Sequence, residues 1–224
     1  MGWEGWPQAR ANPSSTLTTL ARVELDVVVR AVTWAGWSLD EGQLRLLERF
    51  GDWLRDEAIP AGGVGPNEAE RISGRHLADS LLFAGAWPPP DPPATVVDLG
   101  SGVGLPGVPL AILWSQSLVS LVERSGRRVD LMRRLGRMLD LGNVDVIHGD
   151  AARVEVTADL VVARGAAEAD VVTRWGRRLV LPGGRVVIGG SHTAPPVALD
   201  GETIIAVPAD VLDHPVWLRM MAQS

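Results

Sequence analysis

A short β-branched strand that runs directly into a glycine-rich turn constrains this chain more than any other segment. The segment spans residues 95–107 and reads TVVDLGSGVGLPG, with Asp98 near the end of the strand and four glycines after it: Gly100, Gly102, Gly104 and Gly107. β-Branched residues favour a buried strand, and glycine lets the backbone turn sharply and approach a ligand closely. Because α/β proteins build nucleotide and cofactor cradles from a strand, such a turn and a helix, we predict a cradle here.

Length and composition limit the classes of protein that the chain can belong to. Its 224 residues are enough for one large domain, or for a domain with an appendage. The chain has no Cys, which excludes disulfides, thiolate catalysis and Cys-ligated metals. It has no uncharged stretch of roughly eighteen apolar residues, and residues 1–15 lack the basic and apolar regions of a signal peptide. We therefore expect a cytoplasmic protein with no membrane contact.

The residues before the cradle predict helices and loops. Residues 1–19 have no clear period and are predicted to form a flexible tail. Apolar residues at helical spacing over 20–59 predict two or three helices, and the proline- and glycine-rich residues 60–66 predict a loop. Residues 88–93 are proline-rich and predict a stiff connector. We expect residues 20–93 to form an N-terminal helical extension.

From residue 94 to the end, the pattern changes to alternating strands and helices. The predicted strands are 95–99, 118–122, 144–147, 159–163, 185–188 and 203–207. The predicted helices between them are 107–114, 126–140 and 167–179. Such alternation is typical of a doubly wound, mostly parallel sheet, which binds ligands at the carboxyl ends of its strands. We therefore expect an α/β, Rossmann-like domain over residues 94–224.

Two carboxylates favour S-adenosylmethionine over a dinucleotide in the predicted cradle. Residues 102–107 match the dinucleotide-binding pattern G-x-G-x-x-G. Asp98, however, would repel a pyrophosphate and suits the cationic amino acid end of S-adenosylmethionine, directly or through water. Glu123 ends the next predicted strand, where a carboxylate can accept hydrogen bonds from both ribose hydroxyls. The alternatives are a tight turn without a ligand and an NAD-dependent oxidoreductase, although no hydride-transfer site is evident.

Five segments in order resemble the RsmG (GidB) family of bacterial rRNA methyltransferases, over about residues 65–191. The segments are RHLADSL, DLGSGVGLPGVPLAI, LVERSGRRVDLMRRLGRMLDLGNVDVIHGDA, VVARGAAE and LPGGRVVI. The resemblance implies a Rossmann-like class I fold that uses S-adenosylmethionine. It also implies transfer of a methyl group to N7 of a guanine in 16S rRNA, either in the free RNA or in the 30S particle.

The resemblance also implies roles for individual residues. On the cofactor side, Gly100 and Leu105 line the site beside Gly102 and Gly104, Glu123 holds the ribose, and Asp150, Ala151 and Ala152 flank the adenine. On the substrate side, Arg164 lies at the mouth of the site, where it positions the guanine or a phosphate. The lone pair of guanine N7 is nucleophilic without losing a proton, so the transfer needs alignment more than a general base. This agrees with a site in which we assign no base.

The chain departs from the family pattern at several positions. The family usually has a basic residue at the position of Asp150, an acid at that of Ala152, and Lys-Gly where this chain has Gly189 and Gly190. These differences keep two further hypotheses open. One is a methyltransferase that acts on a small molecule, and the other is a non-catalytic, ribosome-associated protein that binds the cofactor.

The helix before the cradle carries Arg75 and His76, whose role the sequence leaves open. Asn67 is predicted to cap this helix, which has an acidic first turn. An internal ion pair of Arg75 with Asp79, four residues later, would fix the helix against the sheet. The family resemblance instead favours substrate contact by Arg75 and His76.

The remaining histidines predict no metal site. His148 is expected to cap the end of a strand. His192 and His214 lie in predicted loops and lack the spacing of metal ligands.

Charge is unevenly distributed along the chain. The formal net charge is −6, and every one of the 21 basic residues is arginine, which argues against a generally basic surface. Residues 124–137 are the exception, with six arginines against Asp130 alone. At about 100° per residue this stretch predicts an amphipathic helix with Val129, Met132, Leu135, Met138 and Leu139 inside and Arg127, Arg133, Arg134 and Arg137 outside. Such a face is either simply solvated or a contact surface for RNA phosphates.

Overall fold

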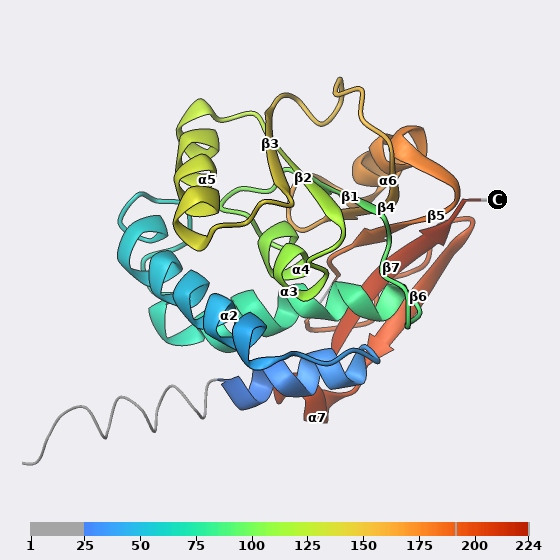
Figure 1. The fold of residues 1–224 in the computed structure, drawn as a ribbon. Helices are drawn as coiled ribbons and strands as arrows, with labels where there is room; N and C mark the ends of the chain where they lie inside the picture. Colours follow the sequence, from blue (N-terminus) through green and yellow to red (C-terminus); the bar gives the residue numbers. More distant parts are fainter. Residues whose placement is uncertain (1–24, 191, 224) are drawn as a thin grey trace, which may run out of the picture.

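A seven-stranded sheet with the order β3-β2-β1-β4-β5-β7-β6 organises the computed structural model, which describes residues 25–190 and 192–223 (Figure 1). The strands are β1 (Thr95–Leu99), β2 (Leu118–Glu123), β3 (Val144–His148), β4 (Ala158–Ala163), β5 (Val180–Ile188), β6 (Glu202–Val207) and β7 (Val216–Ala222). Strands β1 to β5 pair in parallel, and β7 lies antiparallel between β5 and β6. The expected Rossmann-like, doubly wound and mostly parallel sheet is therefore confirmed.

Helices precede the sheet and connect its strands. Residues 25–34 are helical. The α-helices that follow are α2 (Glu41–Trp53), α3 (Asp79–Leu81), α4 (Gly107–Leu113), α5 (Gly126–Leu139), α6 (Ala169–Leu179) and α7 (Ala209–Leu212). Shorter π- and 3₁₀-helical segments extend α2 and flank α3: η1 (Leu54–Ala58), η2 (Ala69–Arg71), η3 (Ile72–Ala78) and η4 (Leu82–Ala86). None of the helices in the described part of the chain is long and apolar enough to cross a membrane.

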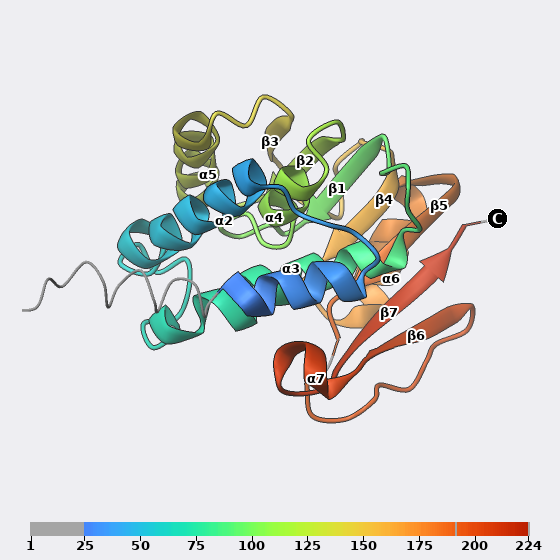
Figure 2. The ribbon, with the colours of Figure 1, turned by 60° about the horizontal axis from the view of Figure 1, so that its bottom comes forward.

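The side chains of each strand alternate between two hydrophobic cores, one on each face of the sheet. Val96 packs with the N-terminal helices, α4 and α5 on one face, whereas Val97 and Leu99 pack with α6 on the other. Figures 1 and 2 show the N-terminal helices as a layer beside α4 and α5. Because successive side chains of a strand point to opposite faces of the sheet, helices can pack on both faces.

Two parts of the sheet differ from the expectation. Strand β5 begins at Val180 rather than at residue 185, because it continues through an irregular stretch that contains Gly183 (φ 79°) before its pairing with β4 resumes. Strand β7 was not predicted at all. It lies between β5 and β6, and its sequence VWLRMMA lacks a simple apolar–polar alternation.

The predicted cap at Asn67 is wrong. Asn67 lies in a turn, and the helical segment begins at Ala69 with Glu68 as its N-cap, without a side-chain capping bond. The Glu68 carboxylate instead faces Arg75 and His76, which lie within 3.3 and 3.2 Å of its Oε2. The Glu68 carboxylate therefore contacts Arg71 in the first turn of the segment and, further along, Arg75 and His76 in η3.

Candidate active site

The turn after β1 has the backbone geometry that its glycines predicted. Gly100, Gly102 and Gly104 have φ values of 70°, 63° and 93°, in the left-handed region where side chains with a Cβ are strained. A Cβ on Gly100 would also come within 2.7 Å of the Cβ of Ala166. The turn can therefore take this shape, with Ala166 close to Gly100, only with glycine at these positions.

Asp98 lies beneath this turn and is fully buried. Its Oδ2 accepts a hydrogen bond from the Gly107 amide (2.9 Å), which ties β1 to the start of α4, and its Oδ1 has no partner among the described residues. Burial raises the pKa of Asp98 to about 7, against the opposing effect of the Gly107 hydrogen bond. Asp98 does not line any of the hollows described below, so its expected contact with a ligand stays a prediction.

Glu123 ends β2 and holds the neighbouring backbone with both carboxylate oxygens. Oε2 accepts from the Gly102 amide (3.0 Å) and Oε1 from the Ser125 amide (2.8 Å). The side chain is nearly buried, with the Arg128 guanidinium 3.9 Å from Oε2. One carboxylate thus connects the glycine turn to the start of α5.

Three adjoining hollows lie over the carboxyl ends of the strands. The first, which we call the ribose hollow because the sequence predicts a ribose beside Glu123, has a volume of about 200 Å³ and is lined by Gly100, Glu123, Asp150, Ala151, Gly165 and Trp175, among others. The second, the turn hollow, has about 380 Å³ and is lined by Gly100, Gly102, Leu105, Glu68 and His76, among others. The third, the Arg164 hollow, has about 340 Å³ and is lined by Arg75, His76, Asp79, Arg164, Gly165, Gly189, Gly190 and His192. Because Gly165 lines all three, they adjoin one another, and we call them together the groove.

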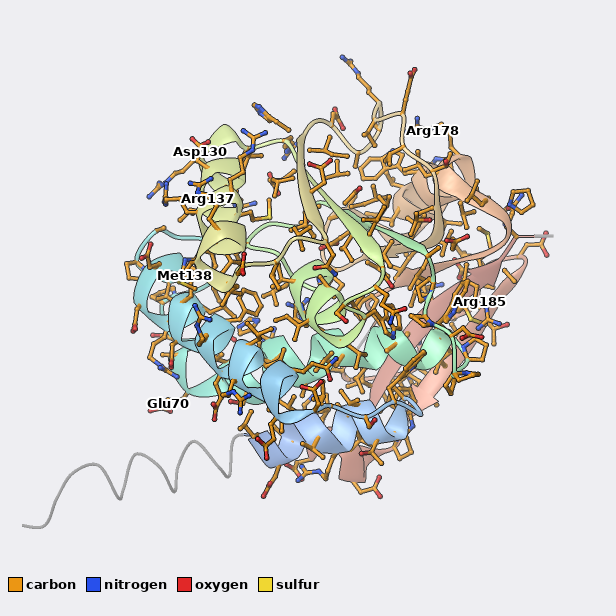
Figure 3. All side chains as sticks on the ribbon, viewed as in Figure 1. Glu70, Asp130, Arg137, Met138, Arg178 and Arg185 are labelled. Atoms are coloured by element: carbon orange, nitrogen blue, oxygen red, sulfur yellow. The ribbon has the colours of Figure 1, made fainter. Side chains whose placement is uncertain are left out.

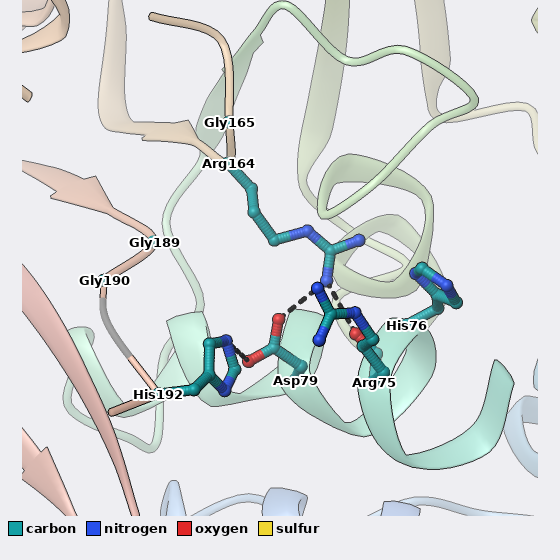
Figure 4. Close-up of a pocket in the computed structure, with 8 residues that line it drawn as sticks. All are labelled: Arg75, His76, Asp79, Arg164, Gly165, Gly189, Gly190 and His192. Atoms are coloured by element: carbon teal, nitrogen blue, oxygen red, sulfur yellow. Dashed lines mark hydrogen bonds and ion pairs between the residues drawn. The ribbon is translucent and has the colours of Figure 1, made fainter. Parts of the chain in front are cut away.

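Arg164 extends from the end of β4 into the Arg164 hollow and is held there by Asp79 (Figure 4). Its Nη1 donates to Asp79 Oδ2 at 2.8 Å and to the Arg75 carbonyl at 3.2 Å. The other oxygen of Asp79 lies 3.7 Å from His192 Nε2, and His192 Nδ1 lies 3.1 Å from His214 Nε2. The internal Arg75–Asp79 ion pair considered from the sequence is therefore absent, because Asp79 pairs with Arg164 and Arg75 with Glu68.

Burial lowers the pKa of both histidines in the groove. For His76, the positive charge of Arg164 lowers the pKa further, while Glu68 acts in the opposite direction. For His192, the Asp79 carboxylate opposes the effect of burial, and the His214 ring adds to it. Both imidazoles are therefore neutral at pH 7, and the cationic groups of the Arg164 hollow are Arg75 and Arg164.

The structure brings most of the predicted site residues to this groove, but not all of them. The predicted residues that line it are Arg75, His76, Gly100, Gly102, Leu105, Glu123, Asp150, Ala151 and Arg164. Gly104 and Ala152 do not line it. Gly104 packs against Val108, and the Ala152 amide donates to Asp150 Oδ1, which shapes the loop after β3. His148, expected to cap β3, contacts the Arg124 carbonyl through Nε2.

Sequence reasoning missed several residues of the groove. Arg128, Trp175 and His192 line it but were interpreted as parts of helices or loops. Arg128 was detectable, because it lies in the first turn of the arginine-rich helix that follows the strand ending at Glu123. His192 was not, since only the return of the chain after β5 brings it to Asp79. Among the described residues, no three His, Asp or Glu side chains are grouped so as to hold a metal ion.

The strand order with an antiparallel β7, together with a glycine-rich turn after β1 and a groove at the carboxyl edge, defines a Rossmann-like protein of the class I methyltransferase type. Residues 43–197 match the GidB family, described as rRNA small subunit methyltransferase G. The chain belongs to this family.

Relatives from several bacteria carry the same description. Ribosomal RNA small subunit methyltransferase G of Mycobacterium leprae (strain TN) is 38% identical over 156 residues, which cover 67% of this chain and 62% of the relative. The protein of the same name from Salinispora arenicola (strain CNS-205) is 37% identical over 187 residues, which cover 79% of this chain and 69% of the relative. The chain thus spans about three fifths of the length of the first of these relatives. Among solved structures, a precorrin-6y C5,15-methyltransferase from Geobacter metallireducens GS-15 is similar, with 14% identity and a TM-score of 0.49, over 66% of this chain and 88% of that one.

Proposed function

We propose that this protein is an S-adenosylmethionine-dependent methyltransferase that modifies N7 of a guanine in 16S rRNA. The observation that carries the proposal is the groove of three adjoining hollows at the carboxyl edge of the sheet, in a chain that belongs to the rRNA small subunit methyltransferase G family. Because rRNA is the proposed substrate, the cytoplasm is the proposed location, and free 16S rRNA or the 30S particle is the proposed partner.

The ribose hollow fits the nucleoside part of S-adenosylmethionine. The two carboxylate oxygens of Glu123 have about four lone-pair sites, of which the Gly102 and Ser125 amides use two. The remaining sites suit the two ribose hydroxyls. Ala151 presents an apolar surface for the adenine, and Asp150 beside it offers an acceptor for the exocyclic amine. The absence of a Cβ at Gly100 lets Ala166, which also lines this hollow, lie close to the turn.

The turn hollow would take the amino acid end of the cofactor, and the Arg164 hollow would take the target base. Gly102 and Leu105 line the turn hollow, whereas Asp98 and Gly104 act from beneath by fixing the shape of the turn. When bound, S-adenosylmethionine supplies a methyl group activated by its sulfonium charge. His76 and Arg164 line both hollows, so they lie where the base and the methyl donor would meet.

The residues of the Arg164 hollow would position the base without removing a proton from it. The N7 atom of guanine needs no general base, so the requirement on the protein is alignment. Arg164 has a guanidinium held by Asp79, with further N–H groups free to bind the O6 atom of guanine or a phosphate. Because His76 is neutral, it adds no charge next to the sulfonium.

A methylation assay with two readouts tests this proposal. Purified protein, S-adenosylmethionine labelled on the methyl group, and 30S particles or protein-free 16S rRNA from cells that lack the modification are incubated together. Digestion and mass spectrometry of the RNA should detect labelled N7-methylguanine at one position. Calorimetry should detect binding of S-adenosylmethionine and not of NAD. Cofactor binding without labelled RNA would instead favour a small-molecule methyltransferase or a non-catalytic protein.

A further inference from the structure

The arginine side chains without a partner among the described residues are concentrated on and just before α5. Most described guanidinium groups form an ion pair or donate a hydrogen bond to another described residue. Five guanidinium groups do neither with any described residue, those of Arg124, Arg127, Arg134, Arg137 and Arg153. Four of these five lie within residues 124–137, and all four are exposed. These four have no ion pair or hydrogen bond of the guanidinium group within the described part of the chain.

These arginines extend from the groove along the outer side of the molecule. Since α5 follows the carboxyl end of β2, its first turn lies at the groove, and Arg124 and Arg128 line the ribose hollow. Arg127, Arg134 and Arg137 lie on the opposite side of the helix from its buried residues. Figure 3 shows Arg137 and Asp130 pointing from α5 away from the sheet. At 1.5 Å per residue, the ten residues from Arg127 to Arg137 cover about 15 Å.

Helix stability explains only part of this positive charge. Arg137 lies in the last turn of α5, where the helix dipole favours a cation. The first turn, which contains Arg127, has no acidic residue, although a helix N-terminus favours negative side chains and disfavours positive ones. Asp130 is three residues after Arg127 and four before Arg134, at the spacing of helical ion pairs, yet it pairs with neither. A positive helix start thus conflicts with the local electrostatics of the helix, and such conflicts are expected at functional sites.

We propose that the α5 arginine face, defined as Arg127, Arg134 and Arg137, binds the phosphate backbone of the substrate RNA next to the nucleotide that enters the groove. This inference rests on the proposed function, because the face leads away from the groove in which the target guanine would lie. Guanidinium groups match phosphate oxygens in a bidentate geometry, and phosphate contacts fix the register of a nucleic acid on a protein. The arginine face thus provides local attraction for RNA on an acidic protein, and determines the direction from which the strand approaches.

A triple variant, Arg127→Ala, Arg134→Ala and Arg137→Ala, tests the proposal. Binding to protein-free 16S rRNA is measured at several salt concentrations, together with the kinetics of N7-methylguanine formation. We expect the variant to bind RNA about tenfold more weakly, with a salt dependence of log K reduced by about 2 to 3 units, because three phosphate contacts are lost. KM for the RNA should rise, while kcat and the affinity for S-adenosylmethionine should match those of the original protein, because none of the three residues lines the groove.

A matched variant controls for the loss of three positive charges. Arg45, Arg55 and Arg174 are exposed, and each pairs with an acid on its own helix or helical segment. Their combined change to Ala should leave RNA binding within about twofold of the original. If the α5 variant keeps its RNA affinity and salt dependence while the original protein methylates rRNA, the inference is overturned and the proposed function stands. An equal loss in the control variant also overturns the inference. An original protein that neither binds nor methylates rRNA overturns both.

Discussion

Glu123 is the single residue whose contacts bear most directly on ligand binding. Its carboxylate holds the amides of Gly102 and Ser125, and the same side chain lines the ribose hollow. The structural and binding roles do not exclude each other, because two backbone donors leave lone pairs unused. The sequence predicted the binding role from the position of Glu123 at a strand end. The backbone contacts appeared only when the turn and the start of α5 were seen together.

Replacement of Glu123 by Gln should weaken cofactor binding while the protein stays folded. Gln has one acceptor oxygen instead of two and no negative charge, so its amide group would face one of the two backbone N–H donors. We expect the affinity for S-adenosylmethionine to fall by at least about tenfold, since a hydrogen bond to a charged group contributes about 1.5–3 kcal/mol. Titration calorimetry measures this effect. Glu155→Gln is the matched control, because Glu155 is exposed and outside the groove, and it should bind within about twofold of the original. Equal affinities of the two variants would contradict the role of Glu123.

Asp98 should make the stability of the cofactor-free protein depend on pH. Burial raises its pKa to about 7, from 3.8. Between these two values the folded state binds more protons than the unfolded state, so the contribution of Asp98 to the free energy of unfolding decreases as the pH rises. Three pKa units correspond to about 4 kcal/mol at most. Asp98→Asn keeps an acceptor for the Gly107 amide and removes the titration. Between pH 5 and pH 8, urea unfolding should therefore show a smaller decrease in the free energy of unfolding for the variant than for the original protein. Equal decreases in the two proteins would show that Asp98 is not the cause.

At the scale of secondary-structure elements, the β6–β7 hairpin contains the charge pair most strongly shielded from solvent. Arg219 Nη1 lies 2.6 Å from Glu202 Oε2, and the Glu202 side chain is 1% exposed. Glu202 also accepts hydrogen bonds from the Leu199 amide and the Thr173 hydroxyl, which joins the hairpin to α6. This network explains how β6, at the edge of the sheet, remains attached to the rest of the fold.

Removal of one partner of this pair should lower the free energy of unfolding more than removal of both. Arg219→Met leaves the Glu202 carboxylate buried without its cation, which should lower the free energy of unfolding by about 3–5 kcal/mol. Addition of Glu202→Gln removes the charge and should restore at least half of that loss. As a control, Arg45→Met breaks an exposed pair with Glu41 and should cost less than about 1 kcal/mol. Chemical unfolding of the four proteins distinguishes these cases, and a double variant no more stable than Arg219→Met would contradict the account.

At the scale of the whole molecule, the N-terminal helices and the sheet share one hydrophobic core. Phe50 and Leu81, from the helices, belong to the same buried cluster as Leu110 and Leu121, from α4 and β2. Trp37 and Trp114 meet edge to face at 5.5 Å. The Gln43 amide donates to the carbonyls of Ile112 and Leu113, which satisfies the end of α4. The helices therefore cover one face of the sheet.

Separation of residues 94–224 from the helical extension should abolish cooperative folding. The fragment would expose the apolar face of the sheet that the N-terminal helices bury. Each Å² of apolar surface exposed to water costs about 25 cal/mol. We expect it to lose its near-ultraviolet circular dichroism and its sharp thermal transition, whereas residues 20–224 should unfold like the full chain. A cooperative transition and cofactor binding by the fragment would instead establish residues 94–224 as an independent domain. The predicted tail, 1–19, lies outside the described residues.

Some elements of the fold can be predicted from the sequence and others cannot, for physical reasons. Strands β1, β2 and β4 were predictable because most of their residues are buried between the two layers of helices, which gives them sequences rich in Val and Leu. Strand β7 escaped prediction because a mixed sequence such as VWLRMMA becomes a strand only through pairing with both β5 and β6. The Asn67 cap failed because the chain makes a turn at Asn67 and the helical segment begins only at Ala69. Local patterns do not contain contacts of this kind.

The amino-acid sequence was enough to predict the alternation of strands and helices, the glycine turn after β1, the two carboxylates near it and the family of the chain. These features follow from local preferences and short spacings, which a linear pattern records. The position of Asp98 beneath the turn, the position of Glu123 at the groove and the pairing of Asp79 with Arg164 rather than with Arg75 depend on the three-dimensional fold. The fold also sets which arginine side chains lack a partner among the described residues. The reason is that pairing and burial depend on residues far apart in the chain, here 85 positions for Arg164 and Asp79.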